Sequence, residues 1–166
     1  MILNNFKKVL YLTSKGGNTG CTREEPVSPV SISGGTSSSN LMYMSSDFCS
    51  YMKYLPSDLN TSNNGDFCIA LGTDDTPVTA DDCKWEHGID NLTNSGYSHK
   101  IVSNNGNWVC RYTRTVTNDT AEDITVKEVA LIMVIAGIKV MIAREVLDQP
   151  VTIKPGGIQA FGIDIG

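Results

Sequence analysis

The densest group of side chains that could do chemistry is an acidic stretch near the middle of the chain. Four aspartates, Asp74, Asp75, Asp81 and Asp82, are followed closely by Glu86. Carboxylate oxygens are the ligands that Ca²⁺ prefers, but this spacing departs from the EF-hand pattern. Two interpretations remain open: the four aspartates form a cation-binding loop, or they cap turns of the backbone on a solvated surface. We favour the second, because the stretch also carries the Gly, Thr and Pro residues of a long loop.

Other catalytic chemistry finds little support in the sequence. The same carboxylates could serve a paired-carboxylate hydrolase, but the sequence places no aromatic walls around them. The glycine-rich stretch 14–20 lacks the GxxxxGK[ST] order of a phosphate-binding loop, and neither His87 nor His99 has a nucleophile signature beside it. The five cysteines are widely spaced and include no CxxC pair, which argues against a zinc site. We therefore predict a protein that is not an enzyme and that has no catalytic residues, metal or cofactor.

Composition and charge narrow the class of protein further. The chain of 166 residues carries 13 basic and 18 acidic residues, a net charge of −5. The basic residues are scattered, whereas a nucleic-acid-binding protein groups them on one face. No apolar run approaches the length of a membrane span, and the N-terminal apolar run is too short for the core of a signal peptide. We predict one domain, made in the cytosol, with neither nucleic acid nor a membrane as partner.

The elements that must position these side chains are strands. The stretch 124–165 is the most apolar part of the chain, and its β-branched runs are separated by Ala136-Gly137, Gln149-Pro150 and a Lys-Pro-Gly-Gly turn at 154–157. We expect four consecutive strands there, the last two forming a hairpin. Upstream, the Asn-Asn-Gly turn at 104–106 predicts another hairpin.

Counting the strand signals gives about eight strands, with a turn signal about every ten residues. They are expected at 41–44, 67–71, 97–102, 107–117, 124–133, 139–147, 151–154 and 158–165. The spacing predicts an all-β fold, an antiparallel β-sandwich of jelly-roll or immunoglobulin-like type. We assign it to residues 41–166.

Residues 1–40 differ in composition from this domain. One short apolar run, Val9 to Leu12, is followed by Gly-Gly pairs, two prolines and a Ser-rich end. Such a segment buries too little apolar surface to offset the entropy of ordering. We predict an extended or irregular N-terminal arm, either a loose tail or an arm that threads over a neighbouring subunit.

Two charged residues stand out within the apolar block. The alternation of inward and outward residues changes phase near Glu128, and a β-bulge there would reconcile the two halves of its strand. Arg144 lies among apolar residues on the next strand. We predict that Arg144 pairs with Glu128 as a buried or interfacial ion pair that fixes the register of the two strands.

Three segments also carry a family resemblance. They read LGTDDTPVTADD at 71–82, ITVKEVALI at 124–132 and AREVLDQPVTIKPGG at 143–157. In this order and spacing they resemble a family of structural proteins of tailed bacteriophages, notably those of gut bacteria. Two positions depart from the family pattern, because Asp74 and Ala130 each stand where the family has Gly. The signature residues are Lys127, Glu128, Arg144, Pro150, Pro155 and Gly156.

The resemblance implies a β-sandwich subunit of the virion, attached to the head, neck or tail, with no catalytic residues. The acidic all-β domain, the lack of site chemistry and the low-complexity arm also suit a homo-oligomer, whose expected partners are copies of itself and other virion proteins. A second hypothesis is a carbohydrate- or receptor-binding module on the particle surface. Its stacking platforms would be Trp85, Tyr97, Trp108 and Tyr112, which would have to share one exposed face.

Overall fold

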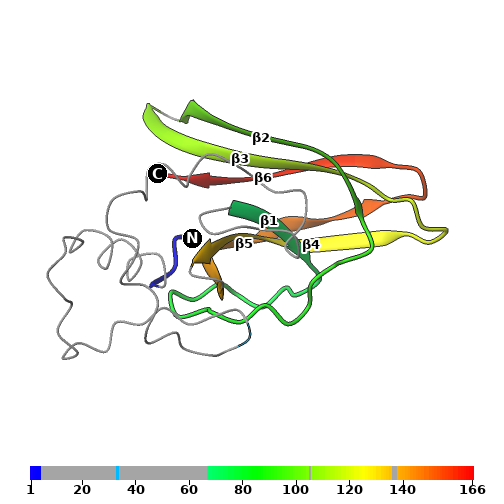
Figure 1. Cartoon of the computed structure of the whole chain (residues 1–166), viewed down its shortest axis with the longest axis horizontal. Coiled ribbons are helices and arrows are strands. Elements are labelled where there is room, and N and C mark those ends of the chain that lie inside the picture. The colour runs from blue at the N-terminus through cyan, green and yellow to red at the C-terminus, as the bar shows by residue number, and fades with distance from the viewer. Residues whose placement is uncertain (5–32, 34–66, 105, 136–137) are drawn as a thin grey trace, which may run out of the picture.

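The computed structural model describes residues 1–4, 33, 67–104, 106–135 and 138–166 (Figure 1). Most of the predicted arm lies outside these residues. So do the strand expected at 41–44 and the Ala136-Gly137 turn. The structure therefore covers the first four residues and nearly all of the segment 67–166.

The regular elements of these residues are six strands in two antiparallel sheets (Figure 1). The strands are β1 (Phe67–Gly72), β2 (Thr93–Asn104), β3 (Asn107–Thr117), β4 (Ile124–Ile135), β5 (Ile138–Ile153) and β6 (Ile158–Ile165). One sheet has the order β1-β4-β5 and the other the order β2-β3-β6. The all-β prediction is confirmed, and so is the hairpin around Gly106, whose φ of 83° is the left-handed conformation that such turns need.

The prediction of eight strands is wrong for the described residues. Besides the strand expected at 41–44, the difference comes from β5, a single strand where two were expected. Its pairing with β4 passes from Val146 opposite Glu128 to Val151 opposite Val126, so that residues 147–150 bulge out. Pro150 is tolerated because it lies in this bulge, outside the paired residues of β4 and β5, where no partner needs the missing N–H. The same shift of register confirms the bulge predicted near Glu128.

The hairpin predicted between the last two strands is also wrong. The turn at 154–157 forms, with Gly156 at a φ of 73°, but β6 pairs with β3 and not with β5. Thr117 lies opposite Ile158, and Cys110 lies opposite Ile165. A turn signal reverses the chain without choosing the strand that pairs next, so the Lys-Pro-Gly-Gly turn carries the chain from one sheet to the other.

Asn118 ties this crossing to a second crossing between the sheets, the β3–β4 connection. Its backbone N–H donates to the carbonyl of Gly157 at 2.9 Å, and its own carbonyl accepts from the N–H of Gly156 at 2.7 Å. Its side-chain amide donates to the carbonyls of Ile153 at 2.8 Å and Glu122 at 2.7 Å. Asn118 is fully buried, and these bonds hold both connections at one end of the molecule.

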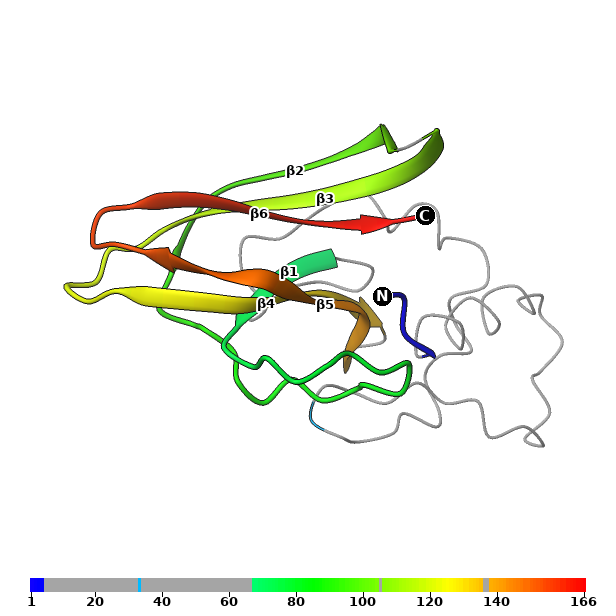
Figure 2. The ribbon, with the colours of Figure 1, turned by 180° about the vertical axis from the view of Figure 1, so that it is seen from behind.

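The hydrophobic core draws side chains from both sheets. Phe67 of β1 stacks on Tyr112 of β3 with ring centroids 5.4 Å apart, and Phe161 and Ile163 of β6 belong to the same cluster. The other face of the β1-β4-β5 sheet is buried as well, under Leu3 and the long loop between β1 and β2 (Figures 1 and 2). This outer face therefore has little contact with solvent, and one charged cluster on it joins the three segments that carry the family resemblance.

Candidate functional site

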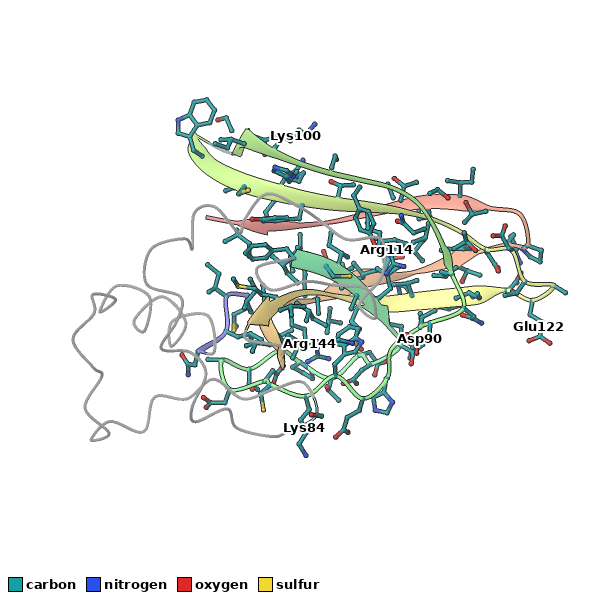
Figure 3. The ribbon with its side chains drawn as sticks, viewed as in Figure 1. Lys84, Asp90, Lys100, Arg114, Glu122 and Arg144 are labelled. Carbon is teal, nitrogen blue, oxygen red and sulfur yellow. The ribbon has the colours of Figure 1, made fainter. Side chains whose placement is uncertain are left out.

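Arg144 is the centre of an ionic network on the outer face of the β1-β4-β5 sheet (Figure 3). Its Nε donates to Oε2 of Glu128 at 2.7 Å, Nη1 to Oδ2 of Asp82 at 2.8 Å, and Nη2 to Oδ2 of Asp74 at 3.1 Å. The predicted pair with Glu128 is confirmed and is buried, with 6% of the Arg144 side chain and 2% of the Glu128 side chain exposed. We call Arg144, Glu128, Asp74 and Asp82 the arginine network.

Gly72 makes room for this network. It lies opposite Glu128 in the pairing of β1 with β4. A Cβ atom at position 72 would be 2.2 Å from Oε1 of Glu128, so a larger residue would displace the carboxylate. The same Oε1 accepts the backbone N–H of Asp74 at 3.2 Å. The carboxylate of Glu128 thus holds the start of the loop that follows β1.

The loop itself is shaped by aspartates that bind neighbouring threonines. Asp74 accepts from the N–H of Thr76 at 3.0 Å and from its hydroxyl at 2.8 Å. Asp82 accepts from the N–H of Thr79 at 3.3 Å and from its hydroxyl at 2.6 Å. The turn predicted at 79–82 is closed by the N–H of Asp82, which donates to the carbonyl of Thr79 at 3.2 Å. These are the capping contacts that we favoured for the acidic stretch.

The other two aspartates of the stretch bind elsewhere. Asp75 accepts from Nζ of Lys127 at 2.7 Å on an exposed part of β4. Asp81 accepts from the side-chain amide of Asn4 at 2.9 Å. The four aspartates therefore do not converge on one point, and the positive charge that Asp74 and Asp82 share is the guanidinium of Arg144.

The pKa values of the network follow from these contacts. Hydrogen bonds from Thr76 and the charge of Arg144 lower the pKa of Asp74. Burial acts to raise the pKa of Asp82, but hydrogen bonds from Thr79 and Arg144 outweigh it, and the pKa is lowered. Burial acts to lower the pKa of Arg144, whereas its hydrogen bonds to carboxylates raise it overall. Both aspartates and the arginine are thus held in their charged forms.

A cleft of about 400 Å³ opens beside the arginine network. Its walls come mainly from the β1–β2 loop and are polar, with Lys84, Trp85 and His87 among the lining residues. Within the described residues, no group of three or more His, Cys, Asp or Glu side chains is arranged to hold a metal ion. The chemistry that the arrangement supports is cross-linking of backbone segments by charge-assisted hydrogen bonds.

The three segments that carry the family resemblance converge on this network. The first supplies Asp74 and Asp82, the second Glu128 and the third Arg144. The remaining signature residues lie apart from it. Lys127 binds Asp75, Pro150 lies in the bulge of β5, and Pro155 and Gly156 form the turn between β5 and β6.

The four aromatic residues proposed as stacking platforms do not share an exposed face. Trp108, beside the β2–β3 turn, is 74% exposed, whereas Tyr112 is buried in the core. Trp85 packs against the cluster on the outer face of the other sheet. Tyr97 is half-buried, with the guanidinium carbon of Arg114 at 6.0 Å from its ring centre. Trp108 alone of the four retains the exposure that a stacking platform requires.

Sequence reasoning missed Asn118 and Arg114. Arg114 reaches from β3 to the carbonyl of Ile69 in the other sheet at 2.9 Å (Figure 3). Asn118 had a usable signal, because an Asn two residues before Thr120 at the end of a strand is typical of an Asx turn. Arg114 had no such signal, because the alternation of side chains predicts that Arg114 faces inward but does not predict which backbone carbonyl it contacts.

Comparisons with known proteins leave the family open. The chain matches no protein-family model, and neither the curated proteins nor the solved structures contain a match to it. No helix within the described ranges is long and apolar enough to cross a membrane.

Proposed function

We propose that this chain is a non-enzymatic structural subunit of a tailed-bacteriophage virion, attached to the head, neck or tail. In this proposal residues 41–166 form a two-layer β-sandwich, and the N-terminal arm and the sandwich contact copies of the chain and other virion proteins. Nucleic acid and membrane are not among its partners. The resemblance of the three segments at 71–82, 124–132 and 143–157 suggests the family.

The observation that carries the proposal is the set of contacts that the four aspartates of the β1–β2 loop make. Each of its four aspartates contacts a side chain of another segment, among them Arg144 of β5 and Lys127 of β4. A catalytic carboxylate must be available to a substrate. Carboxylates that join separate strands and the N-terminal residues act as structural cross-links, which is the role expected in a subunit that must keep its shape within a particle.

Exposed strand edges and apolar side chains offer surfaces for assembly. In the part of the chain that the structure describes, β2 pairs only with β3, so one edge of this long strand is open. Ile101 and Trp108 are 72% and 74% exposed near the tip of that hairpin. Open edges and exposed apolar side chains are typical of protein–protein contacts.

The proposal is tested on purified phage particles. Mass spectrometry of washed virions should find the chain in many copies, and imaging of the particles should place its sheets at repeated positions on the head, neck or tail. Light scattering of the isolated chain should show oligomers at high protein concentration. A chain that is absent from the particles and monomeric at every concentration would overturn the proposal.

A second candidate, a carbohydrate- or receptor-binding module, retains one supporting observation in the exposed Trp108. An exposed indole can stack on a sugar ring. Replacing Trp108 with Ala should abolish binding to a glycan array or to host cells if this function holds, while the thermal stability stays unchanged because the side chain makes little contact with the core. Equal binding by both proteins, or by neither, rejects this candidate.

A further inference from the structure

The first residues of the chain extend the β1-β4-β5 sheet by pairing with β5. Ile2 lies opposite Ala143 in an antiparallel bridge. The N–H of Leu3 donates to the carbonyl of Ile142 at 2.9 Å, and Met1 and Arg144 exchange hydrogen bonds in both directions, at 2.8 and 3.2 Å. Figures 1 and 2 both place the N-terminal segment beside β5. It covers part of an edge that would otherwise be open.

A side-chain anchor holds this short strand in place. Leu3 is fully buried in a hydrophobic cluster on the outer face of the sheet. The other buried members of the cluster are Ala70, Ala130, Ile132 and Met141. Asn4 adds hydrogen bonds to the β1–β2 loop, from its N–H to the carbonyl of Ala80 at 2.8 Å and from its amide to Asp81 at 2.9 Å. The β5 edge and this cluster therefore form a groove shaped for residues 1–4.

The connection from this strand to the rest of the fold is long. The 62 residues from position 5 to position 66 separate Asn4 from Phe67, the first residue of β1. A fully extended chain of that length reaches about 200 Å. Chain length therefore permits residues 1–4 to enter the groove of their own copy or that of a neighbour.

We propose that in the assembled protein residues 1–4 of one copy occupy the β5 groove of a second copy. This inference rests on the proposed function, because assembly supplies the neighbour. Residues 1–4 make the same hydrogen bonds and bury the same leucine whether they bind their own copy or a second copy. Which copy they bind therefore depends on the protein concentration. A tether of this length gives an effective concentration on the order of 1 mM. Dilute chains keep their own strand, and copies packed side by side exchange it, as in domain swapping and donor-strand complementation.

A mixed cross-linking experiment tests the exchange. One full-length chain carries Ile2→Cys and a second carries Ala143→Cys. These residues face each other between two hydrogen-bonded pairs, where the Cβ atoms of antiparallel strands are closest and a disulfide fits well. Neither variant can form this disulfide within one chain. After mild oxidation of a one-to-one mixture above about 1 mM, a covalent dimer is expected, and dilution before mixing should suppress it.

Three further variants make the result decisive. A chain with both cysteines should form the link internally when dilute, which shows that the geometry is correct. Leu3→Asp in the Ile2→Cys chain should reduce the mixed dimer more than about tenfold, because a charge cannot enter the Leu3 cluster. Leu3→Met should preserve the dimer because it conserves volume. The unmodified chain gives the background from the five native cysteines.

The outcomes separate this inference from the proposed function. If the double-cysteine chain links internally but the concentrated mixture gives no more dimer than the Leu3→Asp control, exchange is overturned. If the double-cysteine chain within virions shows internal links only, exchange is again overturned while the proposed function stands. If the chain is absent from virions but the concentrated mixture cross-links, the proposed function fails and exchange between copies is supported.

Discussion

Arg144 shows how one side chain can organise distant parts of a protein. It faces three carboxylates, an excess of negative charge that would be costly if all were buried. Only Glu128 is deeply buried, at 2% exposure, whereas the side chains of Asp74 and Asp82 are 26% and 20% exposed. Water therefore solvates the two aspartates in part, and the buried charge is balanced by the pair of Arg144 and Glu128.

Arg144→Ala should lower the free energy of unfolding by about 3–5 kcal/mol, because it leaves Glu128 buried without a counterion. Urea denaturation followed by circular dichroism measures this. The matched control is Arg111→Ala, which removes a bidentate pair with Asp164 at 2.7 Å whose side chains are 42% and 27% exposed. That change should cost about 1 kcal/mol or less. Equal losses from the two variants would contradict the claim that the buried pair of Arg144 with Glu128 stabilises the fold more than the partly exposed pair of Arg111 with Asp164.

The close approach of Glu128 to Gly72 leaves no room for a larger residue at position 72 unless the Glu128 side chain shifts. A Cβ atom there would meet the carboxylate of Glu128 at 2.2 Å, so Gly72→Ala should lower the free energy of unfolding by about 1–3 kcal/mol as the network shifts. The control is Gly96→Ala in β2, where the nearest atom would be 4.0 Å away. Thermal unfolding of both variants should show a clear loss for Gly72→Ala and little change for Gly96→Ala. The reverse order would rule out the steric argument.

At the scale of elements, two of the three connections between the sheets depend on one another through Asn118. The β3–β4 and β5–β6 connections are held by its backbone and by its side-chain amide. These bonds hold the β5–β6 turn against the end of β3, next to the point where Thr117 pairs with Ile158.

Asn118→Ala should lower the free energy of unfolding by about 1–3 kcal/mol, because the buried carbonyl of Ile153 loses the side-chain amide of Asn118, whereas that of Glu122 keeps the Thr120 hydroxyl. Asn118→Asp should cost at least as much at neutral pH, since a carboxylate would face these carbonyls. Asn91→Ala, in an exposed part of the β1–β2 loop, is the control and should change little. Denaturant titrations of the three variants measure the differences. A small loss for Asn118→Ala would show that the connections close independently.

At the scale of the whole molecule, the arginine network predicts how stability depends on pH. The pKa values of Asp74 and Asp82 are lowered in the folded state from the ordinary value of 3.8. A lowered pKa stabilises the fold at every pH above the unfolded value, and this stabilisation is lost as the pH falls through the folded pKa. The loss should therefore begin near pH 4 and deepen below it.

Asp82→Asn provides the test. The difference in free energy of unfolding between this variant and the parent should be largest near neutral pH and should shrink below about pH 4, where the parent also loses the charge. Urea denaturation at a series of pH values measures it. A difference that is the same at neutral and acid pH would exclude an ionic contribution from Asp82.

Much of this fold could be predicted from the sequence because strands, tight turns and bulges depend on neighbouring residues. The alternation of side chains predicted β3 and β4, the Asn-Asn-Gly turn predicted the β2–β3 hairpin, and the change of phase predicted the bulge at Glu128. The pair of Arg144 with Glu128 could be predicted for the same reason, because it joins adjacent strands of one hairpin. The choice between a cation loop and capped turns could not be made from spacing alone.

The remaining contacts join residues that are distant in the chain. Arg144 meets Asp82 and Asp74 across 62 and 70 positions, and β6 joins β3 although its own turn follows β5. Many pairings of such segments satisfy the same local patterns. Packing selects among them, and the observed arrangement buries both faces of the β1-β4-β5 sheet and gives Glu128 a counterion in the interior.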